Sequence, residues 1–212
     1  MSAAVRTVRI ELPKTAFFVC DIQERFKTAI ANFDHIVNTS AKMLKAAKIL
    51  EVPVFTTEQN PKALGSTVSP LSDLIAQLPP LSAQAVHPKT RFSMDVPGLT
   101  DQWLKQAGDI KHIVIFGIES HVCVLQSTLD LLDKGIDVHV IKDGVSSCNV
   151  GEIEVALERM RSAGAQVTTS ESILFQLLVD ASHPKFKQIS GLIKEEKEPT
   201  KAAVNLLGPA RY

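Results

Sequence analysis

The stretch HIVIFGIESHVCVLQSTLDLLDKGIDVHVIKD, residues 112–143, contains two apolar runs on either side of a helical pattern. Both runs, 112–117 and 137–142, are short, continuous and rich in β-branched residues, so we predict that both are strands. Between them, apolar residues recur with the spacing i, i+3, i+7 and i+10: Val122, Leu125, Leu129 and Leu132. This spacing predicts a helix whose apolar stripe faces the core. Strand, helix and strand in this order form a unit in which the two strands lie parallel.

The same alternation continues in both directions along the chain. Further strands are predicted at 15–20, 52–57 and 166–169, a short one within 86–94, and helices at 34–50, 70–78, 98–107 and 151–163. Continuous apolar strands separated by helices are typical of a parallel sheet covered on both faces. We therefore predict an α/β fold with three layers, α-β-α, around a parallel sheet of about six strands. Residues 1–212 are expected to form one domain, with its core at 13–185 and a surface tail, or an arm that packs on another subunit, at 193–212.

Charge and composition restrict the class of protein. Lys plus Arg and Asp plus Glu are both 23, so the formal net charge is zero, and nothing attracts the whole chain to nucleic acid or to an anionic membrane. The three widely spaced cysteines, Cys20, Cys123 and Cys148, indicate a reducing compartment rather than a disulfide framework. No apolar run reaches the roughly 18 residues that cross a bilayer. We predict a cytoplasmic protein, with a mitochondrial presequence around Arg6 and Arg9 as the alternative.

The ends of the predicted strands are the first place to look for a functional site. In open parallel sheets, ligands bind outside the carboxyl ends of the strands, near the point where the strand order reverses. The polar residues that follow the predicted strands are therefore the candidates: Asp21, Gln23, Glu58, Gln59, and the stretches 119–123 and 143–149. This selection rests on topology alone and does not yet indicate a particular chemistry.

Cys123 lies in the first turn of the predicted helix but not on its apolar stripe. Its own helical row continues to Gln126, Ser127 and Asp130, all of them polar. If Ser120 is the N-cap, Cys123 is at position N3, where the free N–H groups and the helix dipole favour a thiolate. The same N–H groups could bind the oxyanion that forms when a thiolate attacks a carbonyl. The alternative is a small buried hydrophobic residue, which is how most free cysteines behave.

Two charged residues also have both an ordinary and a functional interpretation. Asp21 directly follows an apolar run, where a carboxylate either caps a loop or helix or belongs to a site. Lys89 lies in a Pro-rich connection, 60–95, where a solvent-exposed lysine is the usual finding. Neither residue decides between its two interpretations by itself.

The chain carries none of the common metal or cofactor motifs. His121 and Cys123 are two residues apart, and Cys20 and Cys148 also fall at strand ends, but neither a C-x-x-C nor an H-E-x-x-H spacing is present. G-x-G-x-x-G, G-x-x-x-x-G-K-[ST] and G-x-S-x-G are absent as well. We therefore predict no metal and no cofactor.

Three segments together resemble the isochorismatase-like, or cysteine hydrolase, superfamily. FFVCDIQERF (17–26) resembles its first strand with the D-x-Q-x-x-F signature, and HPKTRFSM (87–94) resembles the segment that carries its lysine. GIESHVCVLQSTLDLLDKGIDVHVIKDGVSS (117–147) resembles the block G-[IV]-x-x-x-x-C-V-x-x-T and the strand that follows it. Order and spacing agree over residues 13–185, and within the superfamily the chain is most similar to the isochorismatase domain-containing proteins.

The resemblance implies a catalytic triad of Asp21, Lys89 and Cys123. It also implies that Gln23 and Phe26 orient the carboxylate of Asp21 and form a wall of the pocket. Members of the superfamily are commonly dimers or larger assemblies, so we expect a homo-oligomer that acts on a small molecule, without nucleic-acid or membrane partners.

A further implication is a cis peptide bond between Ile118 and Glu119, which would turn the N–H groups near Cys123 toward the substrate carbonyl. A non-proline cis bond costs about 3 kcal/mol and usually persists only at functional sites. The oxyanion is then expected on backbone N–H groups of residues 119–123, among them that of Val122.

These residue types imply hydrolysis through a thioester. Asp21 would take the thiol proton, and Lys89 would stabilise the negative charge on both neighbours. The thiolate of Cys123 would attack an amide or similar carbonyl, and water activated by Asp21 would release the acid.

Departures from two branches of the superfamily narrow the substrate class. The metal-binding D-x-H pair of nicotinamidases is replaced here by Thr56-Thr57-Glu58-Gln59, which argues against zinc-assisted hydrolysis of nicotinamide. Isochorismatases proper typically lack the cysteine, so Cys123 favours cleavage of a C–N bond in a small amide or ureido compound. The alternative is a non-catalytic binding or scaffold protein of the same fold. A nuclease is disfavoured because the chain lacks both a basic excess and a metal-ligand spacing.

Overall fold

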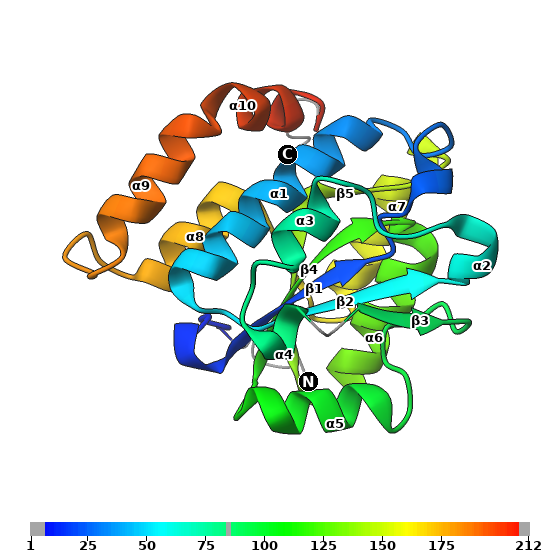
Figure 1. Ribbon diagram of the computed structural model, residues 1–212, viewed down its shortest axis with the longest axis horizontal. Helices are drawn as coiled ribbons and strands as arrows, with labels where there is room; N and C mark the ends of the chain where they lie inside the picture. The colour runs from blue at the N-terminus through cyan, green and yellow to red at the C-terminus, as the bar shows by residue number, and fades with distance from the viewer. Residues whose placement is uncertain (1–6, 84–85, 208–212) are drawn as a thin grey trace, which may run out of the picture.

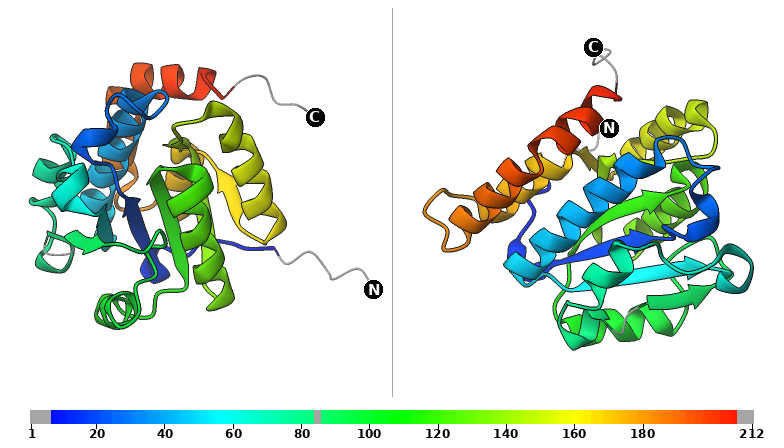
Figure 2. Two further views of the ribbon diagram at one scale, coloured as in Figure 1. Left: turned by 90° about the vertical axis from the view of Figure 1, so that its right-hand side faces the viewer. Right: turned by 45° about the horizontal axis from the view of Figure 1, so that its top comes forward.

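A single parallel sheet organises the computed structural model, which describes residues 7–83 and 86–207. Its strands lie in the order β3-β2-β1-β4-β5-β6, with helices on both faces (Figures 1 and 2). The strands are β1 (Thr15–Cys20), β2 (Val54–Gln59), β3 (Val86–Lys89), β4 (His112–Ile118), β5 (Asp137–Ser146) and β6 (Gln166–Thr168). The predicted α/β class, with a parallel sheet between two helical layers, is confirmed.

Helices connect successive strands and continue beyond the last one. They are α1 (Phe33–Leu50), α2 (Pro61–Leu64), α3 (Leu71–Ile75), α4 (Pro80–Ala83), α5 (Leu99–Ala107), α6 (Leu125–Asp133), α7 (Val150–Ser162), α8 (Ser170–Leu178), α9 (Phe186–Glu195) and α10 (Lys197–Asn205). Single helical turns are η1 (Leu12–Lys14), η2 (Glu24–Phe26) and η3 (Ser120–Val124). Among the helices of the described residues, none combines the length and the apolar character that crossing a membrane requires.

The strands alternate their side chains between two hydrophobic cores. On β1, Phe17 and Val19 pack with α1, α3, α8 and α9, whereas Phe18 and Cys20 pack with α5, α6 and α7. Because successive side chains of a strand point to opposite faces, a strand buried on both faces is apolar throughout. This explains why the run TAFFVC is continuous rather than alternating.

The strand order reverses between β1 and β4. From β1 the chain adds β2 and β3 on one side, and then returns to place β4 on the other side of β1. The loops that leave the carboxyl ends of β1 and β4 therefore diverge and leave a crevice between them. Asp21 follows β1, and the turn that carries Cys123 follows β4, so the topology brings these two sequence candidates to the same crevice.

Several element boundaries differ from the predicted ones. Strand β2 begins at Val54 rather than at residue 52, because Pro53 has no N–H to donate to a ladder. The residue before helix α3 is Pro70 rather than Ser69. Strand β5 runs on to Ser146, four residues past the predicted end, after an irregularity in its register with β4 between Ile115 and Gly117.

The C-terminal segment is helical and packs on the same chain. Helix α10 lies against α1, where Lys42 Nζ donates to Thr200 Oγ1 at 2.8 Å and Lys45 Nζ pairs with Glu196 Oε1 at 2.6 Å. The predicted tail or arm at 193–212 is therefore two packed helices over its described part, which Figure 1 shows in orange and red. Residues 208–212, and Arg6 of the presequence alternative, lie outside the described residues.

The predicted core stripe of the helix after β4 packs against the core through Val122, Leu125 and Leu132, but it is not the most buried face of that helix. Leu125, Leu129 and Leu132 are only partly buried, as is Val122. The buried row is instead Cys123, Val124, Ser127, Thr128 and Leu131. The polar row was expected to face away from the core, but the hydroxyl of Ser127 is satisfied by hydrogen bonds inside the protein, which removes most of the cost of burying it.

Candidate active site

Asp21 is the first residue after β1 and is buried, with 1% of its surface exposed. Its backbone has a positive φ of 54°, a conformation that non-glycine residues adopt only where the surroundings enforce it. The backbone N–H of Asp21 donates to Thr57 O, and Thr57 Oγ1 donates to Asp21 Oδ1 at 2.7 Å. Asp21 Oδ2 accepts from Lys89 Nζ at 2.6 Å. Both carboxylate oxygens are therefore held by donors on neighbouring elements.

Lys89, at the end of β3, forms a buried ion pair with Asp21, and both side chains are 1% exposed. Its ammonium also lies 2.7 Å from Gln59 Oε1, 2.9 Å from Phe92 O and 3.1 Å from Arg91 O. Burial alone would lower the pKa of this ammonium, but the acidic groups around it raise the pKa above its ordinary value: Cys20, Asp21 and Cys123. The acidic neighbours thus favour the charged form of this buried ammonium.

Cys123 lies in the single turn η3, directly before the regular helix α6, and is 5% exposed. Its carbonyl accepts from Ser127 Oγ at 2.6 Å, and the same hydroxyl accepts from the N–H of Met94 at 2.7 Å. Ser127 therefore fastens the turn that carries the thiol to the segment that follows Lys89. Cys123 also lies close enough to Lys89 for its negative charge to raise the pKa of the ammonium.

The turn between β4 and η3 differs from the predicted one. The cis peptide bond of the described residues is Ser69–Pro70, so the bond between Ile118 and Glu119 is trans and the predicted cis bond is wrong. The chain turns instead through Glu119, whose φ of 59° is left-handed.

Gly117 allows β4 to approach β1 closely beside this turn. A Cβ atom at residue 117 would lie 2.2 Å from the carbonyl oxygen of Cys20, and the φ of Gly117 is 141°. Only glycine satisfies both conditions. The thiol of Cys20 donates to Asp21 Oδ2 at 3.6 Å. Burial, the contact with Cys123 and the charge on Asp21 raise the pKa of the Cys20 thiol well above its ordinary value.

The resemblance assigns Gln23 and Phe26 to the pocket. Gln23 contacts a partner of the ion pair, and Phe26 packs against the core. The amide of Gln23 donates to the carbonyls of Gln59 and Gly65, and its oxygen accepts from the N–H of Gln59 at 2.7 Å. Gln23 thus fixes the end of β2, from which Gln59 contacts Lys89. Phe26, in η2, is half-buried against the core on the α1 side.

Thr57 and Gln59 are functional candidates that the pattern of motifs does not reveal. Thr57 contacts Asp21 because it pairs in the sheet with Cys20, the residue before Asp21. Gln59 contacts Lys89 because these two residues pair in the sheet. The rule on strand ends included Gln59 but not Thr57. Glu58, between them, points elsewhere and accepts from both the N–H and the hydroxyl of Thr67, so it is not free to serve as a metal ligand.

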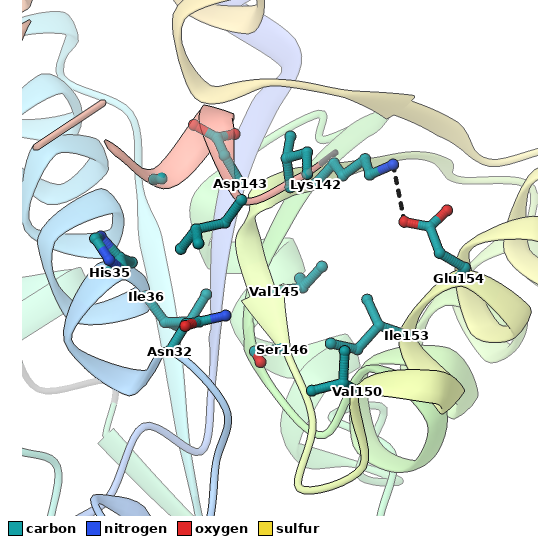
Figure 3. Close-up of a pocket in the computed structure, with 13 residues that line it drawn as sticks. Asn32, His35, Ile36, Lys142, Asp143, Val145, Ser146, Val150, Ile153 and Glu154 are labelled. Atoms are coloured by element: carbon teal, nitrogen blue, oxygen red, sulfur yellow. Dashed lines mark ion pairs between the residues drawn. The ribbon is translucent and has the colours of Figure 1, made fainter. Parts of the chain in front are cut away.

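Two hollows of the surface differ in their relation to the triad. A cavity of about 230 Å³ lies between α1, β5 and α7, and Figure 3 shows Asn32, Lys142 and Val150 at its wall. A second hollow of about 500 Å³ contains Lys89 together with Asn60 and Arg91. We regard the second as the closer to the chemistry, because it borders the ion pair, whereas the first contains no member of the triad.

The α/β fold with its six-stranded parallel sheet is that of the isochorismatase-like hydrolases, the class that the resemblance indicated. Residues 15–172 match the model of the isochorismatase domain, and the chain belongs to the isochorismatase family. Isochorismatase domain-containing protein 2 of Xenopus laevis is 44% identical over 197 residues, which are 92% of this chain and 91% of that protein. Isochorismatase domain-containing protein 1 of Danio rerio is also 44% identical over 85% of this chain, which spans 61% of that protein's length.

Solved structures agree with this assignment. A Caenorhabditis elegans structure described as MAR1 ribonuclease is 42% identical, has a TM-score of 0.80, and aligns over 88% of this chain and 93% of its own. The Escherichia coli YcaC structure, described as an octameric hydrolase of unknown specificity, is 21% identical with a TM-score of 0.78, over 95% of this chain and 98% of its own. At that identity the second likeness concerns the fold alone.

Proposed function

We propose that this chain is a cysteine-dependent hydrolase that cleaves a C–N bond in a small amide or ureido compound. The observation that carries the proposal is the buried ion pair of Lys89 and Asp21, 2.6 Å apart, next to the thiol of Cys123. A desolvated ammonium that faces a thiol favours the thiolate, and a thiolate is the nucleophilic form of cysteine. Membership of a hydrolase family supports the same chemistry.

The reaction begins with the transfer of the thiol proton of Cys123 to the carboxylate of Asp21. The thiolate attacks the carbonyl carbon, an S–C bond forms, and the carbonyl electrons move to the oxygen. N–H groups of the turn at residues 119–123 stabilise this oxygen, other than that of Val122, which donates to the Glu119 carbonyl. The tetrahedral intermediate collapses, the C–N bond breaks, and the nitrogen leaves with the proton that Asp21 returns. A thioester on Cys123 remains.

Hydrolysis of the thioester regenerates the enzyme. Asp21 takes a proton from water, the resulting hydroxide attacks the thioester carbonyl, and the carboxylic acid and the thiol are released. Throughout both steps Lys89 keeps its positive charge and stabilises the negative charge that passes between Asp21 and Cys123. Thr57 and Gln59 position this pair through their hydrogen bonds to Asp21 and Lys89.

The direct test is intact-mass detection of the thioester. The protein is exposed to a panel of small amides and ureides, quenched in acid, and analysed for a mass increase that a peptide digest assigns to Cys123. We expect an adduct that hydroxylamine removes and that is absent in Cys123→Ala. Turnover that persists in Cys123→Ala would contradict the proposal, and so would an adduct confined to Cys20 or Cys148.

Ribonuclease activity is a second candidate, supported by the description of the C. elegans structure. The zero net charge of the chain offers no general attraction for RNA. Cleavage of a labelled RNA by the wild type but not by Lys89→Met would support this candidate. Equal cleavage by both proteins would identify a contaminating nuclease.

We also propose that the chain forms a homo-oligomer. The apolar stripe of Val122, Leu125, Leu129 and Leu132 is only partly buried within one chain, and Val150 and Val155 on α7 are each 64% exposed. Apolar helix faces of this kind are typical of subunit interfaces. Light scattering tests the assembly, and Leu125→Glu is expected to shift it toward the monomer.

A further inference from the structure

Three side chains with metal-binding atoms lie together beside the turn that carries Cys123. Glu119 and His121 come from the turn after β4, and Cys148 comes from the loop after β5. His121 Nδ1 lies 3.3 Å from Glu119 Oε2, and Cys148 Sγ lies 3.7 Å from the same oxygen. The ligand atoms of all three residues are within 4.8 Å of one another. Glu119, His121 and Cys148 do not have a C-x-x-C or H-E-x-x-H spacing in the sequence, so it is the fold that brings them together.

Two of the three distances between these atoms are close to those of a tetrahedral zinc site. With Zn–O and Zn–N bonds of about 2.0 Å and a Zn–S bond of about 2.3 Å, the N···O edge of a tetrahedron is about 3.3 Å and the S···O edge about 3.5 Å. The corresponding distances here are 3.3 Å and 3.7 Å. The third distance, between the imidazole nitrogen of His121 and Cys148 Sγ, is within 4.8 Å. A cation at the centre would therefore need the side chains of His121 and Cys148 to adjust around Glu119.

The three donor types select among cations. One carboxylate oxygen, one imidazole nitrogen and one sulfur suit Zn²⁺, whereas Mg²⁺ and Ca²⁺ prefer oxygen ligands throughout. The carboxylate of Glu119 and a thiolate at Cys148 would together supply two negative charges, which balance the charge of a divalent ion.

The backbone on both sides of the cluster is fixed. Glu119 has a left-handed conformation, and its carbonyl accepts the N–H groups of Val122 and Val124. On the other side, the carbonyl of Ser147 accepts the N–H of Ala31, and Ser147 Oγ lies 3.0 Å from His121 Nδ1. Cys148 is exposed and the His121 side chain is 23% exposed, so an ion can enter from solvent.

We propose that Glu119, His121 and Cys148 form a binding site for one divalent cation of the zinc class. On binding, the Cys148 thiol loses its proton to solvent and its sulfur bonds to the metal, in place of its hydrogen bond to Glu119. Neutral His121 ligates through Nδ1, whose hydrogen bond with Ser147 breaks. Water fills the fourth position.

The site goes beyond the proposed function, because no step of the thioester mechanism uses the side chains of Glu119, His121 or Cys148. The site lies beside the turn that carries Cys123, so a bound metal would affect the active site. A cation on the Glu119 carboxylate would tie the turn that carries Cys123 to the loop after β5. Bound metal is therefore expected to make this turn more rigid, which protection of the Val122 and Val124 amides from hydrogen exchange would report.

The experiment is a titration of the metal-free protein with Zn²⁺ in competition with a chromophoric chelator, and a parallel titration with Co²⁺. We expect one bound ion per chain and a thiolate-to-cobalt charge-transfer absorption in the near ultraviolet. Cys148→Ser should abolish that absorption, and both Cys148→Ser and His121→Ala should weaken Zn²⁺ binding by more than about tenfold. Both residues are at least partly exposed, so the variants are expected to fold, which circular dichroism checks.

The same substitution at the other two cysteines is the matched control. Cys123→Ser and Cys20→Ser should keep both the stoichiometry and the cobalt absorption. The proposal is overturned if the protein binds no Zn²⁺, or if Cys123→Ser removes binding while Cys148→Ser keeps it, because the ion then lies on the active-site thiol. Since these readouts need no turnover, a failure here is distinguishable from a failure of the hydrolase proposal.

Discussion

Lys89 and Lys42 are both buried lysines, and the protein surrounds them in opposite ways. The ammonium of Lys89 lies against a carboxylate at 2.6 Å and within hydrogen-bonding distance of three further oxygens. Lys42 on α1 donates to one hydroxyl, that of Thr200 on α10. The pKa of Lys89 is raised by its acidic neighbours. The pKa of Lys42 is lowered by burial, which more distant carboxylates only partly offset.

Close partners therefore stabilise the charge of Lys89, whereas the charge of Lys42 has little compensation. Burial of a charge costs several kcal/mol unless close partners compensate for it. At the crevice between β1 and β4, four oxygens provide that compensation, and they come from the residue after β1, from β2 and from the segment after β3. Between α1 and α10, a single threonine provides little. We infer that only the lysine at the crevice is required in its charged form.

The largest expected effect is that of Lys89→Met. The substitution leaves the carboxylate of Asp21 buried without its cation, so we expect a loss of about 3–5 kcal/mol in the free energy of unfolding. Urea denaturation measures this loss. The double variant Asp21→Asn/Lys89→Met should recover a substantial part of it, since both charges are then removed. A loss below about 1 kcal/mol in Lys89→Met would mean that the ion pair contributes little, and the contrast with Lys42 would fail.

Thr57→Val tests the second donor to Asp21. The substitution keeps the shape of the side chain but leaves Asp21 Oδ1 without its hydroxyl partner, so we expect a loss of about 1–3 kcal/mol. Thr56→Val, one residue earlier on β2, is the matched control. The hydroxyl of Thr56 is buried and has no hydrogen-bond partner among the described residues, so that variant should not be destabilised. Equal losses in the two variants would show that the hydrogen bond to Asp21 is not the cause.

Alkaline pH should affect the two lysines with opposite sign. The folded-state pKa of Lys42 lies below its ordinary value of 10.5, so between these two values the unfolded chain binds the extra proton and stability rises with pH. The folded-state pKa of Lys89 lies above 10.5, so its contribution is complete below that pH and is lost as pH rises through the folded value. The denaturation midpoints of wild type and Lys42→Met, measured over this pH range, show the sign of the Lys42 contribution. The midpoints of wild type and Asp21→Asn/Lys89→Met show the sign of the Lys89 contribution. The same sign for both would contradict the comparison.

Lys42→Met should have the smallest effect. Replacing a poorly compensated buried charge by an apolar side chain of similar length is neutral or stabilising, so the free energy of unfolding should stay within about 1 kcal/mol of the wild-type value or rise. The same methionine substitution at Lys89 is its counterpart. A loss at Lys42 as large as that at Lys89 would show that burial, rather than pairing, determines both effects.

The sequence could predict the elements and the strand ends, but not the pairing between strands. Continuous apolar runs identified β1, β4 and the start of β5, because a strand buried on both faces leaves little room for polar residues. Thr57 was missed because its role depends on the register that places it beside Cys20. No local pattern encodes that register.

Two errors at the site have physical causes. The spacing of Val122, Leu125, Leu129 and Leu132 correctly predicted a helix but not its most buried face, because Ser127 finds hydrogen-bond partners inside. The cis bond at Ile118–Glu119 was predicted from family resemblance, whereas Glu119 makes the turn with a left-handed conformation. In both cases, backbone and side-chain partners that are distant in sequence decide the local structure.

Residue-resolved alkylation of the three cysteines tests the central claim most directly, that the Asp21–Lys89 pair activates Cys123. Native wild type and Lys89→Met are treated with iodoacetamide, and the labelling rate of each cysteine is measured by mass spectrometry. We predict that Cys123 reacts readily in the wild type and at least about tenfold more slowly in Lys89→Met. Cys148, which is exposed, should keep its rate, and buried Cys20 should stay unlabelled as a check on folding. An inert Cys123, or a Cys123 rate that Lys89→Met leaves unchanged, would contradict the claim.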